Sequence, residues 1–452
     1  MSFITATQEV ISRLGNASVD SLVIKDILLE ANPRHNQAKT LYSQYRGSVP
    51  VAGREILSMA RINEKLPHDY RGLIVDQVVG YMFGRPVTYA VDRAEEDTDE
   101  KFSKKHRALQ EFVYRNSLGE LDSETGKLMS IAGYCGRLLY IDKNGDERAA
   151  VVPPWECIFI KNERTGEIEL ALRHYEITVR TPADGTKLRT KVVVYDNTNV
   201  TTFLEDEGGN FSIHDKPRRH MFNGVPLIKF QNNAEEIGDF EKVSDLIDAF
   251  DRLESDAQSE VEEFRLAYLL LLGGIELDAA TKQKARESGV LSLPAEGDAK
   301  FLTKDLPTEF FASQRDALRE EIYRHSRTVD FASEDFSGGN ISGESRKWKI
   351  LALENRAGTK QMYFEKALRQ QFALLTSVWE KKGVSIREED IDPVFFRNLP
   401  VDVEHYSRVI EKLAPHISKQ TLYELMPFIP DAEEEKARVE AEKEEVGEEL
   451  EE

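Results

Sequence analysis

The sequence has few cysteines and no long apolar run. Its 452 residues include only Cys135 and Cys157, which lack zinc-ligand spacing and form no disulfide framework, so a reducing compartment suits them best. The longest stretch without a charged or strongly polar side chain has ten residues, 266–275, whereas a membrane-spanning helix needs about twenty. The first ten residues have neither a basic segment nor an apolar core. We therefore expect neither a membrane segment nor a secretory signal.

Basic residues are also scarce relative to acidic ones. The chain has 60 Lys and Arg against 81 Asp and Glu, a net charge of −21. Phosphate binding normally uses basic clusters, so this balance argues against general adhesion to nucleic acid. Part of the charge is local, because residues 431–452 contain twelve acids, three bases and almost nothing apolar. We predict that this tail is a solvated helix that frays into disorder.

The order of the secondary-structure patterns predicts an α+β protein. The first sixty residues suggest short amphipathic helices, with Asn32 as a cap and Pro33 at the start of the next helix. From about 135 to 230, short β-rich runs alternate with Gly, Asn and Asp turns. From 237 to 267, apolar residues recur every three or four positions, which predicts one long helix.

After residue 267, the patterns predict a small β-containing segment, a second helix to about residue 328, a loop, and a very long helix to about residue 381. An aromatic and aliphatic stripe predicts this last helix. The stripe consists of Trp348, Leu351, Phe364, Leu368, Phe372, Leu375 and Trp379. This order differs from the alternating strand and helix pattern of a compact α/β enzyme domain.

The polar face of the helix predicted over 237–267 is acidic, with ten acids, Asp239 among them, against three bases. Its charge makes it a candidate functional surface, although surface charges on a helix are usually just solvated. The candidate lining residues are Asp245, Asp248, Asp251, Glu254 and Glu260.

The loop DFSGGNISGESRKWK, residues 335–349, nearly matches a phosphate-binding loop. Such a loop needs Gly-x4-Gly-Lys-Ser/Thr after a buried strand, because the lysine neutralises the bound phosphates. Here Glu344 follows Gly343 in place of the lysine, and a helical pattern precedes the loop. The sequence therefore argues against an ATPase site.

The same loop is rich in glycine, which gives it wide conformational freedom, and it continues into a helix whose first turn carries cations. Cations there oppose the helix dipole by about 0.3–1 kcal/mol each, so neighbouring acids or an external polyanion must offset them. A plain connector and a mobile functional loop both fit. The candidate contact residues are Gly338, Gly339, Asn340, Ile341, Ser342, Gly343, Arg346, Lys347 and Lys349.

Other catalytic patterns are missing from the sequence. The nine histidines are scattered without a His-x3-His pair, and no nucleophile elbow occurs. Acid-x-Lys spacings at Asp298 with Lys300 and Glu434 with Lys436 match a nuclease pattern, but such matches are common by chance in so charged a chain. We expect no catalytic residue, no metal and no cofactor.

Several segments, in the same order, resemble the portal proteins of tailed double-stranded DNA bacteriophages, which connect head to tail. HMFNGVPLIKFQNNAEEIGDFEKVSDLIDAFDRLESD resembles the strand that leads into the family's first stem helix, and EDFSGGNISGESRKWKILALENRA resembles its tunnel loop and following helix. NEKLPHDYRGLIVDQVVGYMFGRPVTY, FFRNLPVD and ISKQTLYELMPFIPDAEEE resemble other family segments. The five blocks are residues 220–256, 334–357, 63–89, 395–402 and 417–435.

The resemblance implies a ring, usually of twelve copies, around an axial channel for DNA. It implies long stem helices, a β-rich wing, a small α/β clip and a helical crown. The implied regions are the wing (1–235 and about 347–403), the stem helices (236–269 and 307–331), the clip (270–306), the tunnel loop (332–346), the crown (404–430) and the acidic tail (431–452).

The resemblance also implies the partners and the place of action. These are double-stranded DNA in transit, the terminase large subunit that supplies the energy, the major capsid and scaffolding proteins, and head-completion or tail adaptor proteins. The place is the portal vertex of the virion, and the host cytoplasm during assembly. Acids lining the channel would centre the duplex by repulsion; alternatively they pair with neighbouring subunits or face outer solvent. A DNA-acting enzyme (ATPase or nuclease) and an acidic scaffold remain the competing hypotheses.

Overall fold

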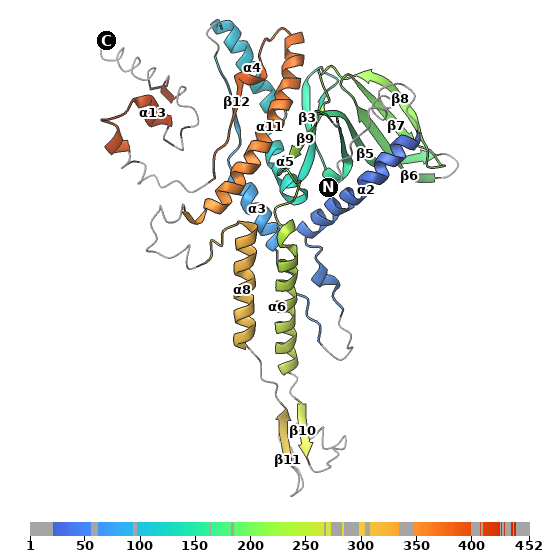
Figure 1. The fold of residues 1–452 in the computed structure, drawn as a ribbon, viewed down its shortest axis with the longest axis vertical. Coiled ribbons are helices and arrows are strands. Elements are labelled where there is room, and N and C mark those ends of the chain that lie inside the picture. Colours follow the sequence, from blue (N-terminus) through green and yellow to red (C-terminus); the bar gives the residue numbers. More distant parts are fainter. Residues whose placement is uncertain are drawn as a thin grey trace.

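The protein is a mixture of helices and antiparallel sheets, which confirms the expected α+β class. Figure 1 shows a broad upper body, two long helices side by side below it, and a short strand pair at the lower end. The computed structural model describes residues 21–55, 62–93, 97–162, 164–181, 185–265, 268–272, 283, 298–302, 308–333, 348–398, 407, 410–424, 426, 429, 435–436 and 438–439.

The N-terminal helix α2 (Ser21–Tyr45) runs without a break through Pro33. The expected helix boundary at Asn32 and Pro33 is therefore wrong. An internal proline costs roughly 3 kcal/mol because it removes one hydrogen bond and crowds the preceding turn. Burial of apolar side chains on both sides of the proline offsets that cost. The buried side chains of α2 are Ile24, Ile27, Ala31, His35, Ala38 and Leu41.

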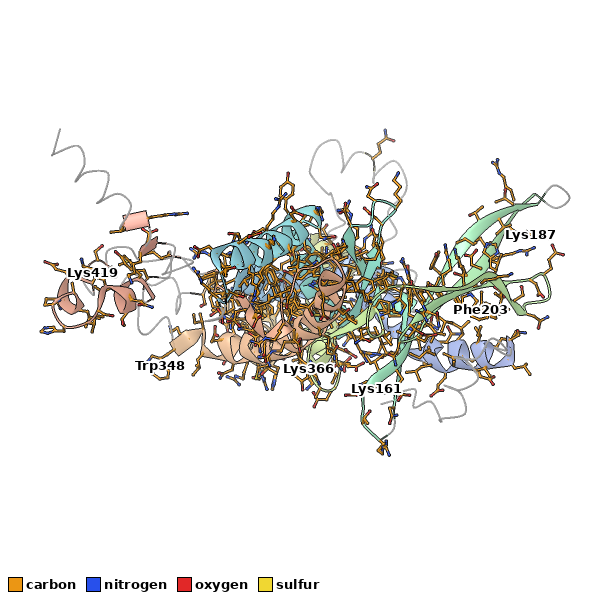
Figure 2. All side chains as sticks on the ribbon, turned by 90° about the horizontal axis from the view of Figure 1, so that it is seen from above. Lys161, Lys187, Phe203, Trp348, Lys366 and Lys419 are labelled. Carbon is orange, nitrogen blue, oxygen red and sulfur yellow. The ribbon has the colours of Figure 1, made fainter. Side chains whose placement is uncertain are left out.

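A five-stranded antiparallel meander forms one end of the body, and α2 covers one of its faces (Figure 1). Alternating apolar residues of the central strands, such as Leu170, Leu172, Val192 and Val194, pack against α2. Phe203 lies in this core (Figure 2). The strands are β4 (Cys157–Lys161), β5 (Ile168–Thr181), β6 (Gly185–Tyr195), β7 (Asn199–Glu205) and β8 (Phe211–Arg219).

The largest core lies around the long helix α11 (Leu351–Lys381), which packs on a three-stranded sheet and on the helices beside it. Phe364, Phe372 and Trp379 of α11 are buried there. The sheet has the order β3 (Glu147–Val152), β2 (Tyr134–Ile141) and β9 (Leu227–Gln231). The helices of this part are α3 (Tyr70–Phe83), α4 (Asp99–Arg115) and α5 (Leu118–Ala132).

Shorter elements complete the described part of the body. A two-stranded antiparallel pair joins β1 (Thr88–Val91) to β12 (Ile391–Val394), so a segment late in the chain returns to α3 and α4. The remaining short helices are η1 (Pro50–Gly53), η2 (Pro154–Glu156), η4 (Glu388–Asp390) and α13 (Lys419–Glu424), of which α13 stands apart from the body in Figure 1.

Two helices, α6 (Ser244–Arg265) and α8 (Thr308–Ser326), lie side by side below the body (Figure 1). We call them the stem helices. Their upper ends share a core that includes Phe240, Ile247, Phe250 and Ile322. At the lower end, β10 (Tyr268–Leu272) pairs antiparallel with β11 (Asp298–Leu302). In the described part of the chain, none of the helices is both long and apolar enough to span a membrane.

The first stem helix begins later than the sequence pattern predicts. Residues 232–240 form an irregular crossing and a 3₁₀ turn, η3 (Glu241–Val243), precedes Ser244. The crossing passes very close to the end of α5, where Gly133 has a φ of +85°. A Cβ on Gly238 would come within 2.3 Å of the Ile131 carbonyl oxygen, and one on Gly133 within 1.9 Å of the Glu236 oxygen. Two glycines therefore permit this close approach.

Candidate functional site

An extended segment, residues 62–69, runs along α6 and is here called the strap. Three side chains of α6, spaced four residues apart, accept hydrogen bonds from alternate amides of the strap. Four helical residues rise about 6 Å and two extended residues about 6.6 Å, so the two spacings match. The N···O pairs are His68 to Asp251 (3.0 Å), Leu66 to Ser255 (3.0 Å) and Glu64 to Ser259 (3.1 Å).

Asp251 is therefore an internal side chain of the stem. It is 0% exposed, and the same oxygen also accepts from Nδ1 of His68 at 3.0 Å. Burial raises the pKa of Asp251, and the hydrogen bonds from His68 oppose that shift. The expectation that Asp251 lines an open surface does not fit this placement, because its carboxylate is used to hold the strap.

The strap bond gives a first testable prediction. Asp251→Ala leaves the partly buried His68 amide without its acceptor, which costs about 1–3 kcal/mol. Because 1.4 kcal/mol corresponds to a factor of ten, amide exchange of residues 62–69 should accelerate by roughly 5- to 150-fold. Hydrogen exchange measured by mass spectrometry checks this. Asp245→Ala, an exposed acid of the same helix, is the control, and equal exchange in both variants would show that the strap is held by other contacts.

Asp248 also contacts the chain's own body. Its Oδ1 lies 2.8 Å from Nη2 of Arg71, whose side chain is 1% exposed. Asp248 thus neutralises a guanidinium that is buried at the start of α3, a helix that Asp69 caps by accepting from the Gly72 amide. The pair fixes the top of α6 to α3, which gives this acid a structural role within one chain.

The three other candidate acids do not share one side of α6. Asp245 is exposed, whereas Glu254 and Glu260 are half-buried. At about 100° per residue, Glu260 lies about 60° from Asp245, and Glu254 lies on the opposite side. On that side α6 packs against α8 near Tyr70, whose pKa is raised by burial with a smaller contribution from Glu254. The acids therefore occupy distinct surfaces of the stem.

Most of the candidate loop residues, Gly338 to Lys347, lie outside the described residues. Of the loop candidates, Lys349 is described and is exposed just before α11. Its neighbour Trp348 is 73% exposed and projects from the end of α11 away from the body (Figure 2). The two ends of the loop are therefore known: the residues after α8, and the start of α11.

Arg356, in the second turn of α11, contacts the end of α8 and the crossing that precedes α6. Its guanidinium donates to the carbonyl of Ser326, the last residue of α8. It also donates to the Asp239 carbonyl at 2.6 Å and lies 3.1 Å from the Asp239 carboxylate, in the crossing that leads into α6. One side chain of the helix after the loop thus joins the end of α8 to the crossing that leads into α6.

Lys360, one turn further along α11, completes a buried ion cluster. Its Nζ lies 2.7 Å from Oδ2 of Asp239 and donates to Ser130 of α5, with Lys360 1% exposed and Asp239 3% exposed. Burial favours a raised pKa for Asp239, but the charges of Arg356 and Lys360 outweigh it and lower the pKa. Asp239 belongs to this cluster and not to the acidic outer face that the sequence pattern indicated.

Glu354 holds the same end of α11 from the other side. It accepts two hydrogen bonds from Arg397 (2.9 Å each, from Nε and Nη2) and another from the Tyr81 hydroxyl. Burial raises the pKa of Tyr81, and its hydrogen bond to Glu354 raises it further. The first turns of α11 are therefore fixed to α3, to α5, to α8, to the crossing before α6 and to the segment after β12.

The sequence offered little signal for these contacts. Arg356 and Lys360 stand four residues apart on a long charged helix, a spacing that is usual for solvated cations. Within the described ranges, no group of three or more His, Cys, Asp or Glu side chains could hold a metal ion. The site thus consists of long helices held together by buried ion pairs and hydrogen bonds. Such a site can position a loop and a polar surface.

Comparison with known proteins gives the family. The model of the family described as phage portal protein, SPP1 Gp6-like, matches residues 24–449. The chain belongs to this family. The match includes the strap, both stem helices, the loop and α11, so the resemblance noted in the sequence is confirmed.

Two relatives support the assignment. The portal protein of Bacillus phage SPP1 is 24% identical over 458 residues, covering 94% of this chain and 87% of that protein. The portal protein of Clostridium phage phiCD119 is 23% identical over 424 residues, covering 88% of this chain and 90% of that protein. The chain thus has the function of a phage portal protein, a structural protein of the virion at the head-to-tail junction.

Proposed function

We propose that copies of this chain close into a ring, of twelve subunits inside the capsid, and that duplex DNA enters and leaves through its axial channel. The observation that carries the proposal is the family match over a chain whose two rod-like helices extend side by side from a wide body (Figure 1). Paired rods repeated around an axis form a tube, and the bodies form a wide collar above it.

The regions of the chain receive roles on this basis. The body, residues 1–235 and about 347–403, is the wing, and 236–269 with 307–331 are the stem. Residues 270–306, which include β11 and the last three residues of β10, are the clip, which docks the terminase large subunit and later the head-completion or tail adaptor proteins. Capsid and scaffolding proteins contact the wing. Residues 404–430 are the crown, followed by the acidic tail.

The tunnel loop, residues 332–346, is the part of the ring that touches DNA intermittently. The helix that follows the loop, α11, is held at its first turns by the ion pairs of Arg356, Lys360 and Glu354. The C-terminal end of the loop is therefore attached to a fixed part of the body. Glycines 338, 339 and 343 allow it to change shape without moving α11. The bases Arg346, Lys347 and Lys349 supply the attraction to phosphate.

The acids of the stem keep DNA centred. Asp248 and Asp251 are directed to contacts within the chain, so the proposal assigns the channel surface of α6 to the side of the exposed Asp245, which lies about 60° around the helix from Glu260. Screening limits repulsion to a Debye length of about 8 Å at physiological salt. The acids therefore act only when the duplex drifts towards the wall, and they leave no deep binding minimum along its path.

Native mass spectrometry of the purified chain tests the proposal. A twelve-copy ring of the 51.5 kDa chain would have a mass of about 620 kDa, and neighbouring ring sizes would be separated by one subunit mass. A monomer or dimer under capsid-like conditions would favour an acidic scaffold. ATP hydrolysis or nuclease activity by the purified ring would favour the enzyme hypothesis.

A further inference from the structure

A shallow pocket lies at the C-terminal end of α2, where the helix meets η2, and the channel proposal gives it no role. Its volume is about 530 Å³. Three of its lining residues lie on a single face of α2, and a fourth, just beyond the helix end at Tyr45, continues the same spacing. The lining residues are Lys39, Tyr42 and Ser43 of α2, with Arg46, Ser48 and Trp155.

The floor of the pocket is aromatic and held in place. The rings of Tyr42 and Trp155 have their centroids 5.0 Å apart at an interplanar angle of 53°, and both side chains are half-buried. Tyr42 also packs against two of the hydrophobic cores of the body. The pocket is thus a fixed concave surface with hydroxyl groups at its edge.

The two cations at the rim, Lys39 and Arg46, are exposed and have no carboxylate partner among the described residues. Some other exposed cations of the body do have one: Lys104 pairs with Glu100, and Arg107 pairs with Glu111. The pocket therefore presents positive charge that the described part of the chain leaves uncompensated.

The surrounding sequence is depleted of acids. From Ala31 to Arg54 the chain has four Lys and Arg and no Asp or Glu, although 81 of its 452 residues are acidic. A stretch of 24 residues would carry about four acids at the average frequency of this chain. This basic stretch gives the pocket a charge opposite to that of most of the protein.

We infer that the pocket binds carboxylate side chains of an adjacent copy of this chain. The inference rests on the proposed ring. Copies that each carry −21 repel one another, and pairing a locally basic surface with an acidic one reduces that repulsion at their contact. A ring contact joins two different surfaces of neighbouring copies, so every pocket can receive an acidic segment from the same side. The aromatic floor gives the incoming side chains a surface that excludes water.

Charge reversal tests the inference. In Lys39→Glu/Arg46→Glu the protein concentration required for half-maximal ring formation should rise at least about tenfold, as measured by native mass spectrometry at physiological salt. The control, Lys101→Glu/Lys104→Glu, makes the same charge change at exposed lysines of α4 and should stay within about twofold of the parent chain. Circular dichroism verifies folding, and Lys39→Gln/Arg46→Gln replaces the first variant if it misfolds.

Crosslinking identifies the occupant. A photo-reactive amino acid in place of Ser43 should join two copies in the assembled ring, and the linked peptide should contain Asp or Glu. If rings form but the pocket variant assembles like its control, or no linkage between copies appears, the inference is wrong. If the parent chain itself forms no ring, it is the proposed function that is wrong, and this outcome is distinguishable from failure of the pocket inference. If the parent chain binds a short DNA duplex and only the pocket variant loses that binding, the ligand is phosphate and not a second copy.

Discussion

Asp239→Ala is expected to lower the free energy of unfolding by about 3–5 kcal/mol, because removing one partner of a buried ion pair leaves the other charge uncompensated. The carboxylate lost here neutralises Lys360, which is 1% exposed, and also contacts Arg356. Arg356 can still reach solvent, but the Lys360 amine would keep only the Ser130 hydroxyl. Urea denaturation of the full chain, followed by tryptophan fluorescence, measures the change.

Two variants separate this effect from general damage. Asp245→Ala removes an exposed acid six residues away and should change stability by no more than about 0.5 kcal/mol. Asp239→Asn/Lys360→Met removes both charges of the pair and should recover more than half of the loss, since no buried charge is left unpaired. A loss below about 1 kcal/mol in Asp239→Ala would show that the cluster does not hold α11 on the stem.

The dependence of this effect on pH has a defined sign. The pKa of Asp239 is lowered from 3.8 by Arg356 and Lys360, against the effect of burial. Its contribution to stability is therefore fully present above pH 3.8 and is lost as the pH falls through the lowered pKa. The difference in stability between the parent chain and Asp239→Asn should narrow in the same range.

Periodicity predicted the elements of this chain where one apolar face meets one core. In α11, Phe364, Phe372 and Trp379 are buried as their spacing indicates. Trp348 and Leu351 continue the same stripe, yet they are 73% and 43% exposed, because the helix extends beyond the body at that end. The sequence pattern predicts the apolar stripe of α11. How much of that stripe is buried depends on segments far away in the sequence, which form the surface against which the helix packs.

For the polar residues of α6, spacing along the sequence does not predict which side chains are buried. Asp251, Ser255 and Ser259 have the spacing of a solvated face, and the strap that binds them lies more than 180 residues earlier in the chain. Asp245, six residues before Asp251, has the same carboxylate chemistry and is exposed. Charge and spacing could identify the stem as polar, but only tertiary contacts distinguish an acid that holds a strap from one that faces an open surface.

Glu260→Lys is expected to reduce the yield of genome-filled capsids by roughly tenfold, whereas Glu254→Lys should stay within about twofold of the parent chain. Both are half-buried glutamates of α6, six residues and about 120° apart around the helix. In a ring of twelve, Glu260→Lys changes the wall by about 24 charges at one level, which turns repulsion into a ring of phosphate contacts. DNA protected from nuclease in packaging reactions measures the yield.

Ring mass by native mass spectrometry must be unchanged in both variants, so that the comparison reports on DNA passage and not on assembly. The packaging defect of Glu260→Lys should become smaller as the salt concentration is raised, because salt weakens contacts between basic side chains and phosphates. Equal yields from the two variants at every salt concentration would show that Glu260 does not line the channel. A stall in Glu254→Lys alone would assign the channel to the side of α6 that meets α8, since the two glutamates differ chiefly in which side of the stem they occupy.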